Sequence, residues 1–221
     1  MTLARRLQEV LPTITVMHQD DFYLPNSEIP VHAATGYDNW DCAESLDWPR
    51  FTQSIQHFRA HAKLPDYKVT EQPGTHGLPL DELTKAKGKE LLAAQGFLID
   101  GQINPLRILV VEGFLLHHDP EILKLFNSLI MLTTESDTLE KRRNSRPGGY
   151  STTDGWWTEP ADYFEKIVWP YYLKYQKMGN EYINRFPRLQ LDSTESTVDQ
   201  LVLDTLAYLT PKLTQCASSM D

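Results

Sequence analysis

Acidic side chains follow two short apolar runs of the sequence. Asp20 and Asp21 come soon after the β-branched run 14–17, and Glu112 comes directly after the run 108–111. Both runs predict buried strands, and in a parallel sheet the polar groups that follow the strands share one crevice. Paired carboxylates there suit proton acceptance from a substrate hydroxyl, or the binding of a hydrated Mg²⁺ ion. For either aspartate alone, capping of a local turn is the alternative.

The densest positive cluster is the run Lys-Arg-Arg-Asn-Ser-Arg at residues 141–146. Arginine binds phosphate through two parallel hydrogen bonds and neutralises charge in phosphoryl transfer. The glycines of Gly148-Gly149-Tyr150 follow closely, which favours a lid that closes over phosphates. A solvated helix face is the alternative interpretation of the same charges.

An aromatic ring stands beside a carboxylate at Trp40-Asp41. This pair suits a nucleoside, because the indole stacks on a ring and the carboxylate accepts hydrogen bonds from ribose hydroxyls. A packed anchor for the surrounding loop explains the pair equally well.

The remaining patterns predict the elements that must position these side chains. Strands are expected at 14–17, 108–111, 129–132 and 189–191, and helices at 2–11, 48–63, 139–146, 161–178 and 198–209. Strands that alternate with helices predict an α/β protein with a mostly parallel sheet. We expect a single domain over 1–221, with a surface insertion at 64–105 and the lid at 139–160.

The composition narrows the class of protein. The chain has 221 residues, of which 41% are hydrophobic and 23% charged, as in ordinary globular proteins. With 30 acidic and 21 basic residues its net charge is −9, which disfavours nucleic acid and anionic membranes as partners. No apolar run approaches the roughly 20 residues of a membrane span. Two cysteines form no disulfide framework, so we expect the cytoplasm, or cytoplasm and nucleus, as the location.

Several motifs occur in the order seen in nicotinamide riboside kinases, which are uridine-kinase-like P-loop kinases. They lie at 19–23, 40–47, 112–116, 141–143 and 168–170. The sequence therefore resembles this family, and its insertion and lid resemble the fungal branch. The resemblance implies a P-loop NTPase-type parallel sheet flanked by helices, and ATP-dependent phosphorylation of nicotinamide riboside to nicotinamide mononucleotide.

The resemblance also implies a role for each matching position. Asp20 would be the general base for the ribose 5′-hydroxyl and a Mg²⁺ partner, and Glu112 would support the metal. The implied substrate-binding residues are Asp20, Asp21, Phe22, Tyr23, Trp40, Asp41 and Arg143. The implied contacts to the co-substrate ATP come from Arg142, Arg146, Glu195, Ser196 and Thr197. The protein would be a monomer or weak dimer.

One family motif has no counterpart in the sequence. The G-x-x-x-x-G-K-[ST] loop, which cradles phosphates, occurs nowhere, because Gly88-Lys89 is followed by Glu90 and lacks the preceding glycine. In the family this loop follows a strand in the middle of the sheet. We therefore expect a truncated chain that is inactive as written. The alternatives are a uridine or cytidine kinase, or a non-catalytic paralogue or isoform that binds a nucleoside or a partner.

Overall fold

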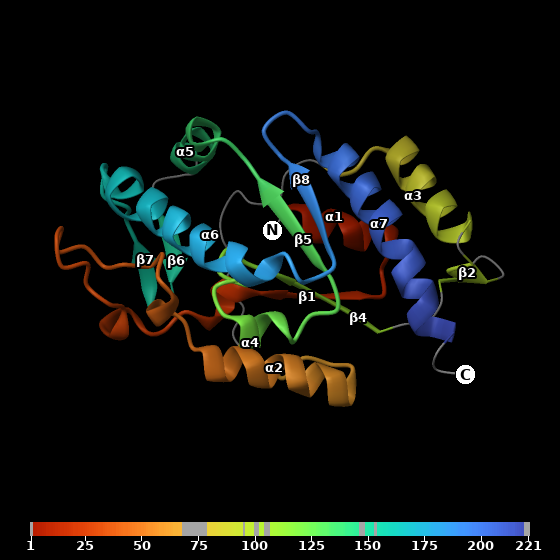
Figure 1. The fold of residues 1–221 in the computed structure, drawn as a ribbon, viewed down its shortest axis with the longest axis horizontal. Helices are drawn as coiled ribbons and strands as arrows, with labels where there is room; N and C mark the ends of the chain where they lie inside the picture. The colour runs from red at the N-terminus through yellow and green to blue at the C-terminus, as the bar shows by residue number, and fades with distance from the viewer. Residues whose placement is uncertain are drawn as a thin grey trace.

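The protein is an α/β fold with helices on both faces of short parallel strands (Figure 1). A computed structural model describes residues 2–67, 79–94, 96–99, 102–103, 107–145, 149–152 and 154–218. The α-helices are α1 (Thr2–Val10), α2 (Trp48–His61), α3 (Glu82–Ala94), α4 (Pro120–Leu123), α5 (Ser136–Asn144), α6 (Trp169–Ile183) and α7 (Val198–Ser218). The short helical turns are η1 (Gln19–Phe22), η2 (Asn26–Glu28), η3 (Ala43–Ser45) and the π-helical η4 (Phe164–Val168).

Two pairs of parallel strands carry the site. Strand β1 (Ile14–His18) pairs with β4 (Ile108–Glu112), and β5 (Leu129–Thr133) pairs with β8 (Arg188–Asp192). The predicted α/β class and parallel pairing are confirmed in these pairs. The antiparallel pairs are β2 (Leu98–Ile99) with β3 (Gln102–Ile103), and β6 (Tyr150–Thr152) with β7 (Gly155–Trp157).

The β1–β4 pair lies between two layers of apolar side chains. Ile14 and Val110 pack in the cluster formed with α1, α3 and α7. Met17 and Val111 pack in the cluster formed with α2 and α4. Successive side chains of a strand point to opposite faces, so both faces of this pair are covered by helices.

The segment 64–105 contributes to the core. Leu80, Leu92 and Phe97 are buried with the side chains of α1 and α7. Helix α3 packs on both of these helices (Figure 1). Most residues of α3 are exposed, so this part of the predicted surface insertion lies at the surface and packs one apolar face against the core.

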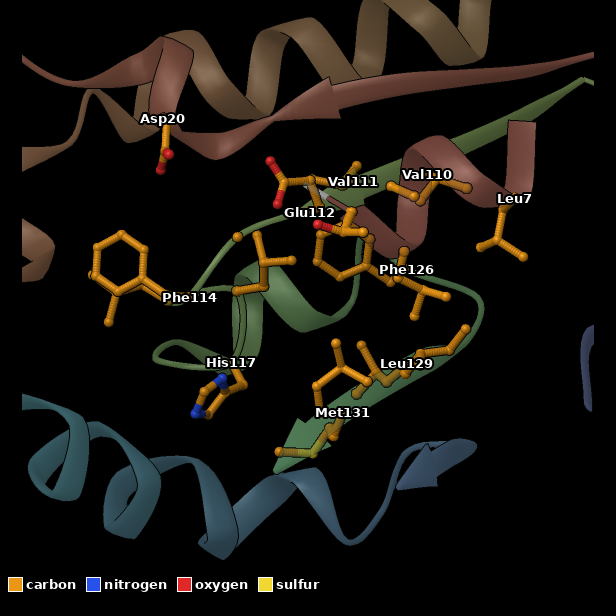
Figure 2. A pocket seen from close by; sticks show the side chains of 18 of the residues that line it. Leu7, Asp20, Val110, Val111, Glu112, Phe114, His117, Phe126, Leu129 and Met131 are labelled. Atoms are coloured by element: carbon orange, nitrogen blue, oxygen red, sulfur yellow. The ribbon is translucent and has the colours of Figure 1, made fainter. Parts of the chain in front are cut away.

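A large cavity separates the two parallel pairs. Among the described residues, β4 pairs only with β1 and β5 only with β8. Side chains of both β4 and β5 line the same cavity of about 2190 Å³ between them, as Figure 2 shows. The burial predicted for the run 108–111 is only partial, because every residue of β4 is half-buried. In β5, Leu132 is 45% exposed.

Candidate active site

The cavity collects most of the side chains that the sequence pointed to. It extends from the space between β4 and β5 to the loops after the strands. The predicted site residues on its wall are Asp20, Tyr23, Trp40, Asp41, Glu112, Arg142, Arg143 and Ser196. These residues lie far apart in the sequence, and the parallel strands bring them together as expected for the carboxyl edge of an α/β sheet.

Asp20 and Glu112 form the acidic part of the site. Asp20 lies on η1, directly after β1, and Glu112 is the last residue of β4. Both carboxylates point into the cavity (Figure 2). Burial, reinforced by the negative charge of Glu112, raises the pKa of Asp20 to about 6. A carboxylate of this basicity is suited to accept a proton near neutral pH.

His18 accompanies Glu112 and was not singled out from the sequence. The register of β1 and β4 places these residues opposite each other, and His18 Nδ1 lies 2.5 Å from Glu112 Oε1. Burial tends to raise the pKa of Glu112, but the contact with His18 and the positive charge of the N-terminal amino group together outweigh it, so the pKa lies below its ordinary value. Glu112 is therefore ionised at neutral pH, as a metal ligand must be.

Gln19 sets the path of the chain after β4. Its side-chain Oε1 accepts hydrogen bonds from the backbone N–H groups of Phe114 (3.0 Å) and Leu115 (3.1 Å). A Cβ at Gly113 would lie 2.5 Å from the Cβ of Gln19. Glycine is needed at 113 because the two segments approach too closely for a side chain. This contact fixes the loop that directly follows Glu112.

Asp41 and Arg143 form a second charged group in the cavity. Arg143 Nη2 lies 3.6 Å from Asp41 Oδ2, and its Nε contacts both carboxylate oxygens of Glu159 at 3.0 and 2.8 Å. Burial raises the pKa of Asp41, and the charge of Arg143 opposes that rise. The Tyr163 hydroxyl accepts a hydrogen bond from the backbone N–H of Trp40, next to this group.

Trp40 is held by aromatic neighbours on the cavity wall. Its ring centroid lies 5.3 Å from that of Tyr23, edge-on, and 5.9 Å from that of Trp157. It is only 7% exposed and belongs to an apolar cluster with Ile167. These contacts favour the loop-anchor interpretation of Trp40, and its stacking on a nucleoside ring stays a prediction.

The positions predicted to contact ATP are spread over three segments. Arg142 donates from Nη2 to the backbone oxygen of Ser193 (2.6 Å), which ties α5 to the loop after β8. Ser196, in the same loop, lines the cavity. Thr197 accepts a hydrogen bond from the backbone N–H of Gln200, at the start of α7. Glu195 and Thr197 are not on the cavity wall, and Arg146 lies outside the described residues.

Asp21 and Phe22 lie beneath the site and do not line the cavity. Phe22 is fully buried, with its ring 5.3 Å from that of Phe51. The Arg50 guanidinium lies 5.1 Å from the Phe22 ring and donates to the backbone oxygen of Asp21. The Phe22 ring is turned toward α2 and lies off the cavity wall, and the implied role of Phe22 in substrate binding stays a prediction.

The fold and site together define a class of protein: an α/β protein with carboxylates and arginines at the carboxyl ends of parallel strands. No family model matches the chain. Among curated proteins, it is 31% identical over 178 residues to the nicotinamide riboside kinase of Schizosaccharomyces pombe, a match that covers 78% of this chain and 71% of that protein.

Two further relatives carry the same name. The nicotinamide riboside kinase of Eremothecium gossypii is 32% identical over 172 residues, or 77% of this chain and 68% of that protein. Human nicotinamide riboside kinase 1 is 27% identical over 198 residues, which cover 90% of this chain and 80% of that protein. The chain belongs to the nicotinamide riboside kinase family, which confirms the predicted resemblance to this family of enzymes. No described helix has the length and hydrophobicity needed to cross a membrane.

Proposed function

We propose that this protein transfers the γ-phosphoryl group of ATP to the 5′-hydroxyl of nicotinamide riboside, forming nicotinamide mononucleotide. The observation that carries the proposal is the single cavity that holds Asp20 and Glu112 at one place and Asp41 and Arg143 at another. Asp20 and Glu112 suit the reacting 5′-hydroxyl, and Asp41 and Arg143 suit the ribose. The names of the relatives give the substrate.

Asp20 accepts the proton of the attacking hydroxyl in this proposal. With a pKa of about 6 it is mostly ionised at pH 7.5 and basic enough to take the proton as the phosphoryl group arrives. Asp41 accepts hydrogen bonds from the ribose hydroxyls, and Arg143 donates to their oxygens. These contacts hold the 5′-hydroxyl near Asp20, and positioning of this kind is the main source of rate in phosphoryl transfer.

Asp20 and Glu112 fit a Mg²⁺ ion. Mg²⁺ takes one or two carboxylates and completes its shell with water and phosphate oxygens, and these two carboxylates face the same cavity. The described residues contain no group of three or more acidic, histidine or cysteine side chains suited to a metal, so in this proposal water and phosphate oxygens supply the remaining ligands. When bound, the ion neutralises charge on the phosphates.

The phosphate cradle is the part that this sequence does not contain. We propose that a strand followed by a G-x-x-x-x-G-K-[ST] loop fits between β4 and β5. Thr2 and Leu3, at the start of α1, also line the cavity there, so the loop would lead into this helix. The polypeptide expressed from Met1 would then transfer no phosphate, and Arg142, Arg146 and Ser196 would meet ATP only when the loop is present.

The test compares two forms of the protein. One starts at Met1, and the other carries a β-branched strand and a G-x-x-x-x-G-K-S loop before Thr2. We expect ADP release that depends on nicotinamide riboside from the extended form alone. A third form with the loop lysine changed to alanine controls for the added length. Riboside-dependent ADP release from the Met1 form refutes the need for the loop, and preference for uridine or cytidine over nicotinamide riboside refutes the substrate.

A further inference from the structure

Glu159 contacts Arg143, on the part of the cavity wall that also holds Asp41, but it does not itself line the cavity. It follows the β6–β7 hairpin, while Arg143 belongs to α5, so the contact between them joins two segments beside the site. Their side chains are 16% and 18% exposed. In a pair this far from water, solvent and salt screen the attraction between the two charges less than in an exposed pair.

Arg143 has two carboxylates within reach, and it contacts them unequally. Its Nε lies 2.8 and 3.0 Å from the oxygens of Glu159, whereas Nη2 lies 3.6 Å from Asp41. The guanidinium is also flanked by the rings of Tyr150 and Tyr163, at 5.2 and 5.8 Å. Of these contacts, the two hydrogen bonds to Glu159 are the shortest.

This unequal pairing has a chemical consequence for Asp41. Arginine and carboxylate frequently form a close pair with two parallel hydrogen bonds. Were Arg143 free to close on Asp41, the pair would use the carboxylate oxygens and N–H groups that a ribose diol needs. At 3.6 Å the two groups stay near each other without a hydrogen bond.

We infer that Glu159 is a positioning residue for the ribose: it holds Arg143 through Nε, keeps the guanidinium off Asp41, and leaves both groups for the vicinal hydroxyls. Because Asp41 and Arg143 are assigned to the riboside only in the proposed function, the role of Glu159 rests on it. Glu159 itself touches no substrate.

The experiment measures binding of two ligands to the full chain by calorimetry. One is nicotinamide riboside, and the other is its 2′,3′-dideoxy analogue, which has no diol for Asp41. We expect Glu159→Gln to weaken riboside binding by about tenfold and to leave binding of the analogue within about twofold. Glu159→Asp keeps the charge and recovers part of the riboside affinity. Glu165→Gln, an exposed acid on the nearby η4, is the matched control and changes neither affinity.

Two results overturn the role of Glu159. Equal weakening of both ligands by Glu159→Gln means that the residue only supports the local fold, and unchanged riboside binding means that Arg143 does not depend on it. Thermal melts by circular dichroism identify any variant that has lost its fold. If the unaltered chain binds the analogue as tightly as the riboside, or binds neither, the proposed function fails first, and the role of Glu159 fails with it.

Discussion

Asp20→Asn is expected to stabilise the fold at neutral pH while removing the proposed base. The pKa of Asp20 rises from 3.8 to about 6 on folding, mainly because burial disfavours the charged carboxylate and Glu112 repels it. The native state therefore binds a proton more tightly than the unfolded chain. Asp20 contributes no penalty below pH 3.8, and the penalty grows until pH 6 and stays constant above it.

The size of the effect follows from that rise in pKa. At 1.4 kcal/mol for each pKa unit, the ionised Asp20 lowers the free energy of unfolding by about 3 kcal/mol above pH 6. This value is an upper bound, because Asp20 is half-buried and water in the cavity screens its charge. Asparagine has nearly the same shape and no charge, so Asp20→Asn removes the penalty. With a slope of about 3 kcal/mol per molar urea, the midpoint moves up by as much as about 1 M.

The difference in stability between Asp20→Asn and the unaltered chain is measured by urea unfolding at several pH values between 4 and 8. Circular dichroism follows the unfolding, and EDTA excludes metal ions. The difference between Asp20→Asn and the unaltered chain should be near zero at pH 4 and largest at pH 7 and above. Asp66→Asn is the control, because the Asp66 side chain is 97% exposed. A difference that does not change with pH, or a lower midpoint for Asp20→Asn at pH 7.5, refutes the reasoning.

Three further outcomes are expected. In the form extended by the phosphate loop, Asp20→Asn should lower riboside-dependent ADP release by about 100-fold or more, and activity within about tenfold of the unaltered form would remove the base role. Gly113→Ala should lower the free energy of unfolding by about 1–3 kcal/mol in a urea titration, because its Cβ would press on Gln19. Gly36→Ala, where φ is +74° and no atom lies near the new Cβ, measures the separate cost of a left-handed backbone, which Gly113 does not have. Leu92→Ala should lower the free energy of unfolding by about 2–5 kcal/mol in the same titration, because Leu92 is fully buried. A loss no larger than that of Leu83→Ala, at an exposed position of α3, would show that Leu92 does not pack in the core.

The sequence alone determined the local elements. The β-branched run 14–17 and the apolar run 108–111 formed the predicted parallel strands. The helix predicted from 48 begins at Trp48, and the Asp47 carboxylate caps it by accepting a hydrogen bond from the backbone N–H of Arg50 (3.0 Å). These features depend on backbone preference and on neighbours a few residues away, which the sequence displays directly. The order of the motifs also carried the family, since each motif is local.

Only the tertiary structure decided which distant groups meet. His18 reaches Glu112 through the register of two strands, and Glu159 reaches Arg143 through the path of a hairpin. The burial of Leu92 depends on which surface covers the apolar face of α3. The exposure of β4 and β5 depends on what lies between them. The sequence pattern of a helix or strand shows that it has an apolar or charged face. Which surface that face meets is determined by the packing of the whole chain, because that packing decides which surfaces are buried together.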